Sequence, residues 1–180
     1  MKICFIVNAN SPHTRRWIEP VIENGHQVYI ISFLPNPPKI SGAIEMLDLT
    51  KLVNLPKVRF AQWGFWLRRY LKEIQPDILH AHQIPGAGWL AAMSGFKPMV
   101  ITGWGSDILI EPHRSIFRRH LVNFVFHRSQ ALTVPSKLMY DAAIQLGYSE
   151  SDLYLIPWGI EIDIFYPDAE VFIAIAAKGF

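Results

Sequence analysis

The sequence predicts an α/β domain built on an open, doubly wound and mostly parallel sheet. The first observation is that apolar runs of strand length alternate with stretches of helical length along the chain. The second lies between Pro76 and Asp107, where two apolar runs flank an Ala/Gly/Leu/Met stretch, Ile84 to Gly95, as in a strand–helix–strand unit. The strands of such a unit are parallel and buried on both faces, and ligands bind beyond their carboxyl ends.

The individual strands and helices follow from the same pattern. The apolar runs of strand length are residues 2–7, 27–33, 77–81, 98–102, 130–134 and 153–156. A weaker run, Ile44 to Leu49, predicts a further strand. Ser11 and Pro12 begin the first helix and Gly25 ends it, because serine caps helices and proline fits the first helical position. Ser136 caps a later helix in the same way.

The composition indicates a folded domain. Of the 180 residues, 51% are hydrophobic and 18% are charged, which supports a large core and argues against disorder. No apolar run reaches the roughly 18 residues of a membrane span. The single cysteine, Cys4, cannot form an internal disulfide and indicates a cytoplasmic protein. The net charge is only +2, and we expect no nucleic-acid partner.

The loop after the run 98–102 carries the most informative polar residues. Glycine amides in this loop, Gly105 among them, are suited to binding ligand oxygens. Ser106 and Asp107 suit hydrogen bonds to hydroxyl groups, and Trp104 suits stacking on a sugar face. The alternative is an aspartate that caps a helix beside a packed tryptophan.

Two histidines end the preceding strand. His80 and His82 are two residues apart and therefore share one face of that strand. We expect no metal there, since zinc takes three or four ligands and no convincing third is near in the sequence. His80 is interpreted as a core residue and His82 as a ligand contact.

The turn after the first strand is a third candidate. It places a helix N-terminus together with Asn10, Ser11, His13 and Arg16 at the same sheet edge, which suits an acceptor or a phosphate. An ordinary capped turn explains the serine and the proline after it, but neither the histidine nor the arginine.

A dinucleotide-binding fingerprint offers a competing function. Residues 86–91, Gly-Ala-Gly-Trp-Leu-Ala, match the pattern GxGxxA, and Asp107 lies 21 residues after Gly86. In the true motif the first glycine follows the strand directly, whereas residues 83–85 intervene here. An NAD-binding domain therefore remains the first alternative.

The stretch Arg59 to Glu73 combines aromatic and basic residues on one predicted helix. Membrane-contact candidates on it are Trp63, Trp66, Arg68, Arg69 and Lys72. The rings are equally suited to packing on the sheet. A non-catalytic module that binds an anionic membrane surface or a partner through this helix is the second alternative.

Five segments together resemble one known family. They are Asn10 to Trp17, Pro76 to His82, Trp104 to Ile108, Leu132 to Ser136, and Ile156 to Ile160 followed by Phe165-Tyr166-Pro167. In this order they resemble the N-terminal domain of a GT-B glycosyltransferase of the retaining family 4 type. Three positions depart from the common pattern: Asn8-Ala9 in place of paired glycines, Trp104 in place of a donor-contacting histidine, and Trp158 in place of an asparagine.

The resemblance implies an organisation and an activity. Residues 1–168 would form a Rossmann-like acceptor-side domain, with 169–180 a tail or the start of an interdomain linker and the C-terminal donor-binding domain absent. A sugar of hexosyl type would pass from a nucleotide-sugar to a glycan, polysaccharide or lipid-linked acceptor with retention, without a metal or a tightly bound cofactor. The turn 10–16, His82 and residues 104–107 would line the acceptor side. We expect the chain alone to be inactive, and the full enzyme to work in the cytoplasm or peripherally at the inner membrane face.

Overall fold

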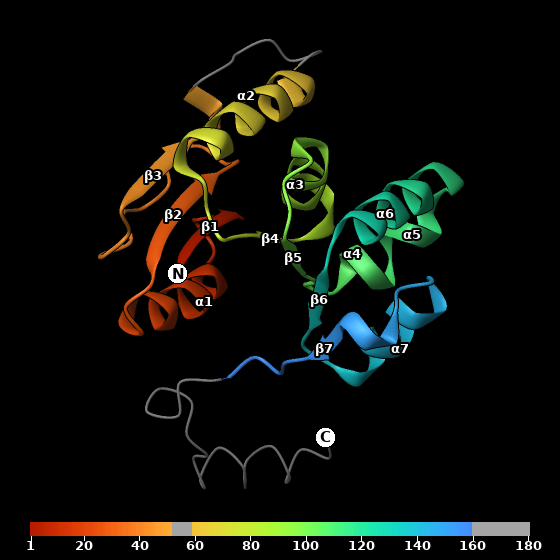
Figure 1. Cartoon of the computed structure of the whole chain (residues 1–180). Coiled ribbons are helices and arrows are strands. Elements are labelled where there is room, and N and C mark those ends of the chain that lie inside the picture. The colour runs from red at the N-terminus through yellow and green to blue at the C-terminus, as the bar shows by residue number, and fades with distance from the viewer. Residues whose placement is uncertain (52–58, 160–180) are drawn as a thin grey trace, which may run out of the picture.

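A parallel sheet forms the centre of the computed structural model, which describes residues 1–51 and 59–159, without the side chains of residues 59–61. The described residues form seven strands in the order β3-β2-β1-β4-β5-β6-β7, and every neighbouring pair is parallel (Figure 1). The strands are β1 Lys2–Val7, β2 Gln27–Ser32, β3 Glu45–Asp48, β4 Ile78–His82, β5 Met99–Thr102, β6 Ala131–Val134 and β7 Leu153–Leu155. The weak run at 44–49 is therefore a strand, as predicted. The expected domain end near 168, the motif at 165–167 and the tail 169–180 lie outside the described residues.

Helices connect the strands and cover both faces of the sheet. They are α1 Pro12–Glu23, α2 Arg59–Ile74, α3 Trp89–Ser94, α4 Ser106–Leu109, α5 Glu111–Arg114, α6 Ile116–Arg128 and α7 Lys137–Gln145. Single 3-10 turns follow β3 at Leu49–Lys51 and precede β7 at Glu150–Asp152. The predicted doubly wound α/β class is confirmed.

The segment Ile84 to Gly95 differs from the single helix that the sequence predicts. Residues 84–88 form an irregular turn, in which Pro85 has an extended ψ of 139° and Gly86 a positive φ of 79°. The helix begins only at Trp89 and ends at Ser94. The reason is local, since proline lacks an amide donor and glycine readily adopts positive φ, so together they favour a turn.

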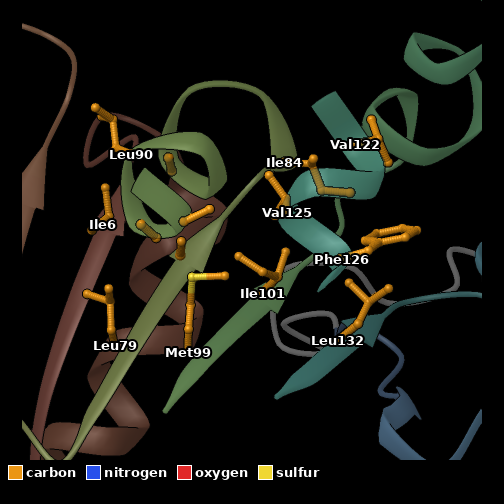
Figure 2. Packing of buried hydrophobic residues seen from close by; sticks show 14 of the residues in the cluster. Ile6, Leu79, Ile84, Leu90, Met99, Ile101, Val122, Val125, Phe126 and Leu132 are labelled. Carbon is orange, nitrogen blue, oxygen red and sulfur yellow. The ribbon is translucent and has the colours of Figure 1, made fainter. Parts of the chain in front are cut away.

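The core has two parts, one on each face of the sheet. α2, α3, α6 and α7 contribute to the larger part, and α1 packs on the other side with residues such as Phe5 and Ile30 (Figure 1). Figure 2 shows strand residues such as Leu79 and Ile101 near Leu90 and Val125 of the covering helices. This packing fixes the strand ends, and with them the loops at the carboxyl edge of the sheet.

Candidate functional site

The candidate site lies where the sheet changes direction. The chain runs from β1 outward to β2, and β4 lies on the other side of β1, so the loops after β1 and β4 diverge. In open parallel sheets, ligands bind in the crevice that such a divergence leaves at the carboxyl edge. The loops after β5 and β7 reach the same edge.

Aromatic and imidazole rings from four parts of the chain meet at this edge. We call them the ring cluster: His13 and Trp17 of α1, His80 and His82 of β4, Trp104 after β5 and Trp158 after β7. The ring centroid of His13 lies 4.7 Å from that of Trp158 and 5.6 Å from that of Trp104. Trp104 and Trp158 are 5.4 Å apart. The ring of His82 lies 5.5 Å from that of Trp17 and 6.0 Å from that of Trp104. Two predicted site histidines and the predicted tryptophan are thus in one cluster.

His80 is a satisfied core residue, as the sequence suggested. Its Nε2 is 2.7 Å from Thr102 Oγ1, which is in turn 2.8 Å from Thr133 Oγ1. Burial lowers the pKa of His80 to about 4, so its imidazole is neutral near pH 7. This hydrogen-bonded chain joins β4, β5 and β6, and through it the His80 ring of the ring cluster is fixed to the sheet.

His82 has a different environment. Its side chain is fully buried, yet neither ring nitrogen has a hydrogen-bond partner among the described residues. Burial, and to a smaller extent the neighbouring His80, lower the pKa of His82 well below its usual value. The neutral imidazole keeps one donor and one acceptor. Since buried polar groups are normally hydrogen-bonded, the two ring nitrogens of His82 are an exception that favours a functional role over a purely structural one.

A cavity opens beside the ring cluster. It has a volume of about 200 Å³ and is lined by His13, Arg16 and Trp17 of α1 and by residues 156–159. Arg16 Nη1 donates a hydrogen bond to the Gly159 carbonyl oxygen at 3.3 Å, which ties α1 to the segment after β7. A wall of rings with one guanidinium suits a ligand that has apolar faces and hydroxyl or phosphate oxygens.

Asp107 is buried and faces its own loop. Its carboxylate accepts hydrogen bonds from the backbone amides of Gly105 at 2.8 Å, Trp104 at 3.0 Å and Ile84 at 3.2 Å. Burial raises the pKa of Asp107 even though these hydrogen bonds act to lower it. The carboxylate therefore joins the loop after β5 to the turn after β4, and it positions Trp104. Gly105 permits this loop with a φ of 138°, in the region that favours glycine.

A second cavity is lined in part by Trp104. Its volume is about 220 Å³, and it is lined by Gln83, Pro85, Trp104, Ser106, Asp107, Glu111 and Arg118. Ser106 is exposed at this cavity, in contrast to Asp107. Of the predicted residues 104–107, Trp104 therefore contributes a ring to the second cavity, Ser106 an exposed hydroxyl group, and Asp107 a buried carboxylate that supports the loop.

The remaining residues of the first turn support it structurally. Asn10 Nδ2 donates to the Pro35 carbonyl oxygen at 3.2 Å. Ser11 begins α1 with extended backbone, but its side chain makes no capping hydrogen bond. Thr14 Oγ1 instead donates to the Asn8 carbonyl oxygen at 2.7 Å. Of the four residues predicted here, His13 and Arg16 line the cavity.

A family comparison adds to this geometry. A model of the glycosyl transferase 4-like family matches residues 2–136. The chain belongs to the glycosyl transferase 4-like family. The family expected from the sequence is therefore confirmed, together with the Rossmann-like α/β fold.

Solved structures resemble this glycosyl transferase 4-like domain in fold. HepE from Anabaena, solved in complex with UDP-glucose, has a TM-score of 0.64 and 17% identity, over 99% of this chain and 49% of that chain. Sucrose-phosphate synthase from Thermosynechococcus elongatus has a TM-score of 0.66 and 14% identity, over 97% of this chain and 52% of that one. UDP-GlcNAc 2-epimerase from Methanocaldococcus jannaschii has a TM-score of 0.61 and 14% identity, over 87% of this chain and 45% of that chain. The chain thus spans about half the length of these proteins. None of the curated proteins matches it significantly.

The dinucleotide fingerprint of this glycosyl transferase 4-like domain has a packing explanation. A Cβ atom on Gly88 would lie 3.1 Å from the Gln83 carbonyl oxygen and 3.2 Å from Val125 Cγ1 of α6. The glycine therefore lets the turn and α6 approach closely. The helix that follows has only 6 residues. These contacts account for Gly88 without a nucleotide.

The membrane-contact candidates on α2 divide between core and surface. Trp63 is only 2% exposed and belongs to the core, so of the two alternatives left open for its ring, membrane contact or packing on the sheet, the structure shows packing. Trp66 is half-buried and stacks on Tyr70 with centroids 4.8 Å apart. Arg68, Arg69 and Lys72 are exposed. No helix in the described part of the chain is long and apolar enough to cross a membrane.

Sequence reasoning missed several residues of the site. Trp17 and Trp158 were not among the predicted site residues, and neither were Glu111 and Arg118. The spacing of His13 and Trp17 was a usable signal, because residues four apart share one helix face. Within residues 1–51 and 59–159, no three His, Cys, Asp or Glu side chains are grouped so that they could hold a metal ion.

Proposed function

We propose that this chain is the acceptor-side, N-terminal half of a retaining glycosyltransferase, which moves a hexosyl group from a nucleotide-sugar to a lipid-linked or polysaccharide acceptor. The observation that carries the proposal is the ring cluster: His13, Trp17 and Trp158 line a cavity together with Arg16, and the buried imidazole of His82 has no hydrogen-bond partner among the described residues. Family membership supports a transferase, and the UDP-glucose bound to HepE supports a nucleotide-sugar as co-substrate. No tightly bound cofactor is needed for this reaction.

The chemistry of the cluster suits a sugar. Carbohydrates present apolar C–H faces and hydroxyl edges, and aromatic side chains offer an apolar face beside a polar handle. Trp104 and Trp158 would contact those faces, and their indole N–H groups, both without hydrogen-bond partners among the described residues, would donate to hydroxyls. The neutral imidazole of His82 would accept a hydroxyl proton at one nitrogen and donate from the other.

The role of this half in the reaction is positioning. Holding the acceptor hydroxyl in reach of the anomeric carbon converts an encounter of two substrates into a step within one complex. Arg16 would place a positive charge near oxygens of the donor or acceptor. The groups that stabilise the leaving phosphate would come from a second, donor-binding domain.

The first test is saccharide binding. The chain is screened against an array of soluble oligosaccharides, and the strongest binder is titrated with tryptophan fluorescence as the readout. We expect Trp104→Ala to weaken binding by about tenfold or more, which corresponds to about 1.4 kcal/mol. Trp66→Ala on α2 is the matched control and should leave the affinity unchanged. Absence of any binder, or equal losses in both variants, would contradict the proposal.

The second test concerns activity. We expect the chain alone to release no UDP, GDP or ADP from the corresponding nucleotide-sugars above the uncatalysed rate, because in the proposed enzyme a second, donor-binding domain would supply the other half of the catalytic cleft. The chain extended by a donor-binding domain should release nucleotide in the presence of acceptor, and NMR of the product should show the anomeric configuration of the donor. Turnover by the chain alone would overturn the assignment of this half as a partial site.

A further inference from the structure

The surface of α5 and α6 exposes large apolar side chains. Ile116 is 72% exposed, Phe117 67% and Ile110 50%, and Phe124 is also exposed. Phe117 and Phe124 are seven residues apart, so they lie on the same side of α6. The opposite side of α6, with Val122 and Val125, is buried in the core (Figure 2). Clustered exposed apolar side chains of this kind mark an interaction surface.

The same surface is strongly basic. Residues 110–128 contain four arginines, three histidines and one acid, Glu111. Glu111 pairs with Arg114 and Arg118. Arg119 and Arg128 form no ion pair within the described parts of the chain, and Arg128 Cζ lies 5.3 Å from the ring centroid of Phe124. Apolar side chains flanked by unpaired arginines complement a surface that is negative outside and apolar beneath.

This surface adjoins the candidate site. Glu111 and Arg118 line the second cavity together with Trp104, which is also a member of the ring cluster. The first turn of α6 therefore lies at the mouth of the site. A partner bound to the surface would lie next to any ligand of Trp104.

We infer that the α5–α6 surface docks on an anionic lipid bilayer. Ile116 and Phe117 enter the interface, and Arg119 and Arg128 contact lipid phosphates. Juxtamembrane basic residues gain about 1 kcal/mol each from an anionic leaflet, and buried apolar side chains add to this. The inference rests on the proposed function in one respect, namely that the bilayer carries the lipid-linked acceptor to the second cavity. Bilayer binding itself requires no sugar.

The surface of α2 is the competing location. Among residues 62–74 of this helix, whose side chains the structure describes, Phe65 is the one strongly exposed large apolar side chain, at 75%, because Trp63 is buried and Trp66 is half-buried. Arg68 and Lys72 line a groove of about 680 Å³ with Lys97. Residues 62–74 of α2 thus carry charge without a cluster of exposed rings, and they serve as an internal comparison.

Vesicle sedimentation tests the inference. The chain is mixed with vesicles of phosphatidylcholine, with and without phosphatidylglycerol, at low and physiological salt. We expect binding only to the anionic vesicles, and less at the higher salt because screening weakens it. Ile116→Ser combined with Phe117→Ser should lower the partition coefficient about tenfold or more. Arg119→Glu should lower it as well, whereas Phe65→Ser combined with Arg68→Glu should leave it nearly unchanged.

The other outcomes distinguish a lipid bilayer from a second copy of the chain as the partner of the α5–α6 surface. Failure of the chain to bind anionic vesicles, or loss of binding only in the α2 variant, would overturn the inference. Concentration-dependent dimerisation that disappears in Ile116→Ser with Phe117→Ser would assign the surface to a second copy instead. All substituted side chains are exposed, and denaturant unfolding of each variant checks that it is folded. Oligosaccharide binding is measured without vesicles, so failure of the proposed function and failure of bilayer docking are distinguishable.

Discussion

The buried imidazole of His82 has no hydrogen-bond partner among the described residues, which is unfavourable for stability but suits a binding site. A buried polar group without a partner destabilises a fold by about 1–3 kcal/mol, and such groups are concentrated at sites where a ligand completes the hydrogen bonds. Its neighbour His80, on the same strand, has a partner in Thr102. Of these two histidines, His80 therefore stabilises the core, whereas His82 is the candidate for a ligand contact.

Substitution of the two histidines should separate these roles. We expect His82→Phe to leave the free energy of unfolding at pH 7 unchanged or to raise it by about 1 kcal/mol, because it removes unpaired polar atoms from among aromatic rings. The same variant should lose most oligosaccharide affinity. His80→Phe should instead lower the free energy of unfolding by about 1–3 kcal/mol, since it leaves the buried Thr102 hydroxyl with one partner fewer. Urea unfolding measures the stability of both variants, and titration with the oligosaccharide measures their affinity. Equal destabilisation of the two variants would contradict the separate roles assigned to His80 and His82.

Sequence reasoning identified where these residues lie but not how they point. Strand ends in a parallel sheet share an edge, so His82 and Trp104 could be placed together in advance. The direction of the Asp107 side chain could not be predicted. The same loop sequence is compatible with a carboxylate that binds ligand hydroxyls and with one that accepts hydrogen bonds from the amides of its own loop. Only the positive φ of Gly105 and the neighbouring turn decide it.

At the scale of the element, helix starts that look alike in sequence differ in the structure. Ser136 Oγ accepts a hydrogen bond from the Met139 amide at 3.3 Å, whereas Ser11 makes no such bond. Pro12 supplies the first helical position of α1, and Thr14 bonds to Asn8. The serine signal correctly predicted both helix starts without revealing which hydroxyl stabilises its helix.

Alanine substitution of the two serines measures this difference. Ser136→Ala should lower the free energy of unfolding by about 1 kcal/mol, since a capping hydrogen bond is lost. Ser11→Ala should change it by no more than a few tenths of a kcal/mol, as expected for a surface substitution without a lost bond. Denaturant unfolding of both variants tests this, and a larger loss for Ser11→Ala would refute the assignment.

The irregular stretch after β4 shows that residue composition did not predict where the following helix begins. Small and apolar residues from 84 to 95 have helical composition, and the βαβ pattern predicted the unit correctly. The turn at Pro85 and Gly86 shortens the helix because backbone chemistry overrides composition there. In contrast, the strand at Glu45–Asp48 is only weakly apolar and is recognised by its pairing with β2.

At the scale of the whole molecule, the buried histidines make stability depend on pH. The pKa of His80 falls from 6.5 to about 4 on folding, and that of His82 is also lowered. Unfolded chains therefore bind protons first as the pH falls, so acid favours unfolding. Asp107 acts in the opposite direction, because burial raises its pKa and the folded state takes up that proton more readily.

We expect the free energy of unfolding to fall between pH 6.5 and about pH 4, by up to about 3 kcal/mol from His80 alone. Urea unfolding at a series of pH values measures this. The slope should be shallower in His82→Phe, which has one titrating group fewer. A slope that is the same in this variant would mean that His82 does not titrate between the two states.

The sequence predicted that the sheet is parallel and belongs to the α/β class, but it did not predict the order of the strands in the sheet. Alternating strands and helices imply right-handed crossovers and a parallel sheet. Nothing in the sequence states that the chain reverses its direction after β3 and returns to the far side of β1. That reversal depends on long-range packing between α2 and the sheet, with Leu67 and Leu71 buried in the larger core. It also creates the crevice in which the ring cluster lies.

The central place of β1 has a consequence for synthesis on the ribosome. β1 is made first and pairs with β2 on one side, where Lys2 lies opposite Gln27, but its other neighbour is β4, where Ile3 lies opposite Ile78. A nascent chain that ends before β4 therefore carries β1 with one open edge, although Cys4 and Ile6 of this strand are fully buried in the folded domain. Both edges of this first strand are closed only after residues 78–82 of β4 have been synthesised.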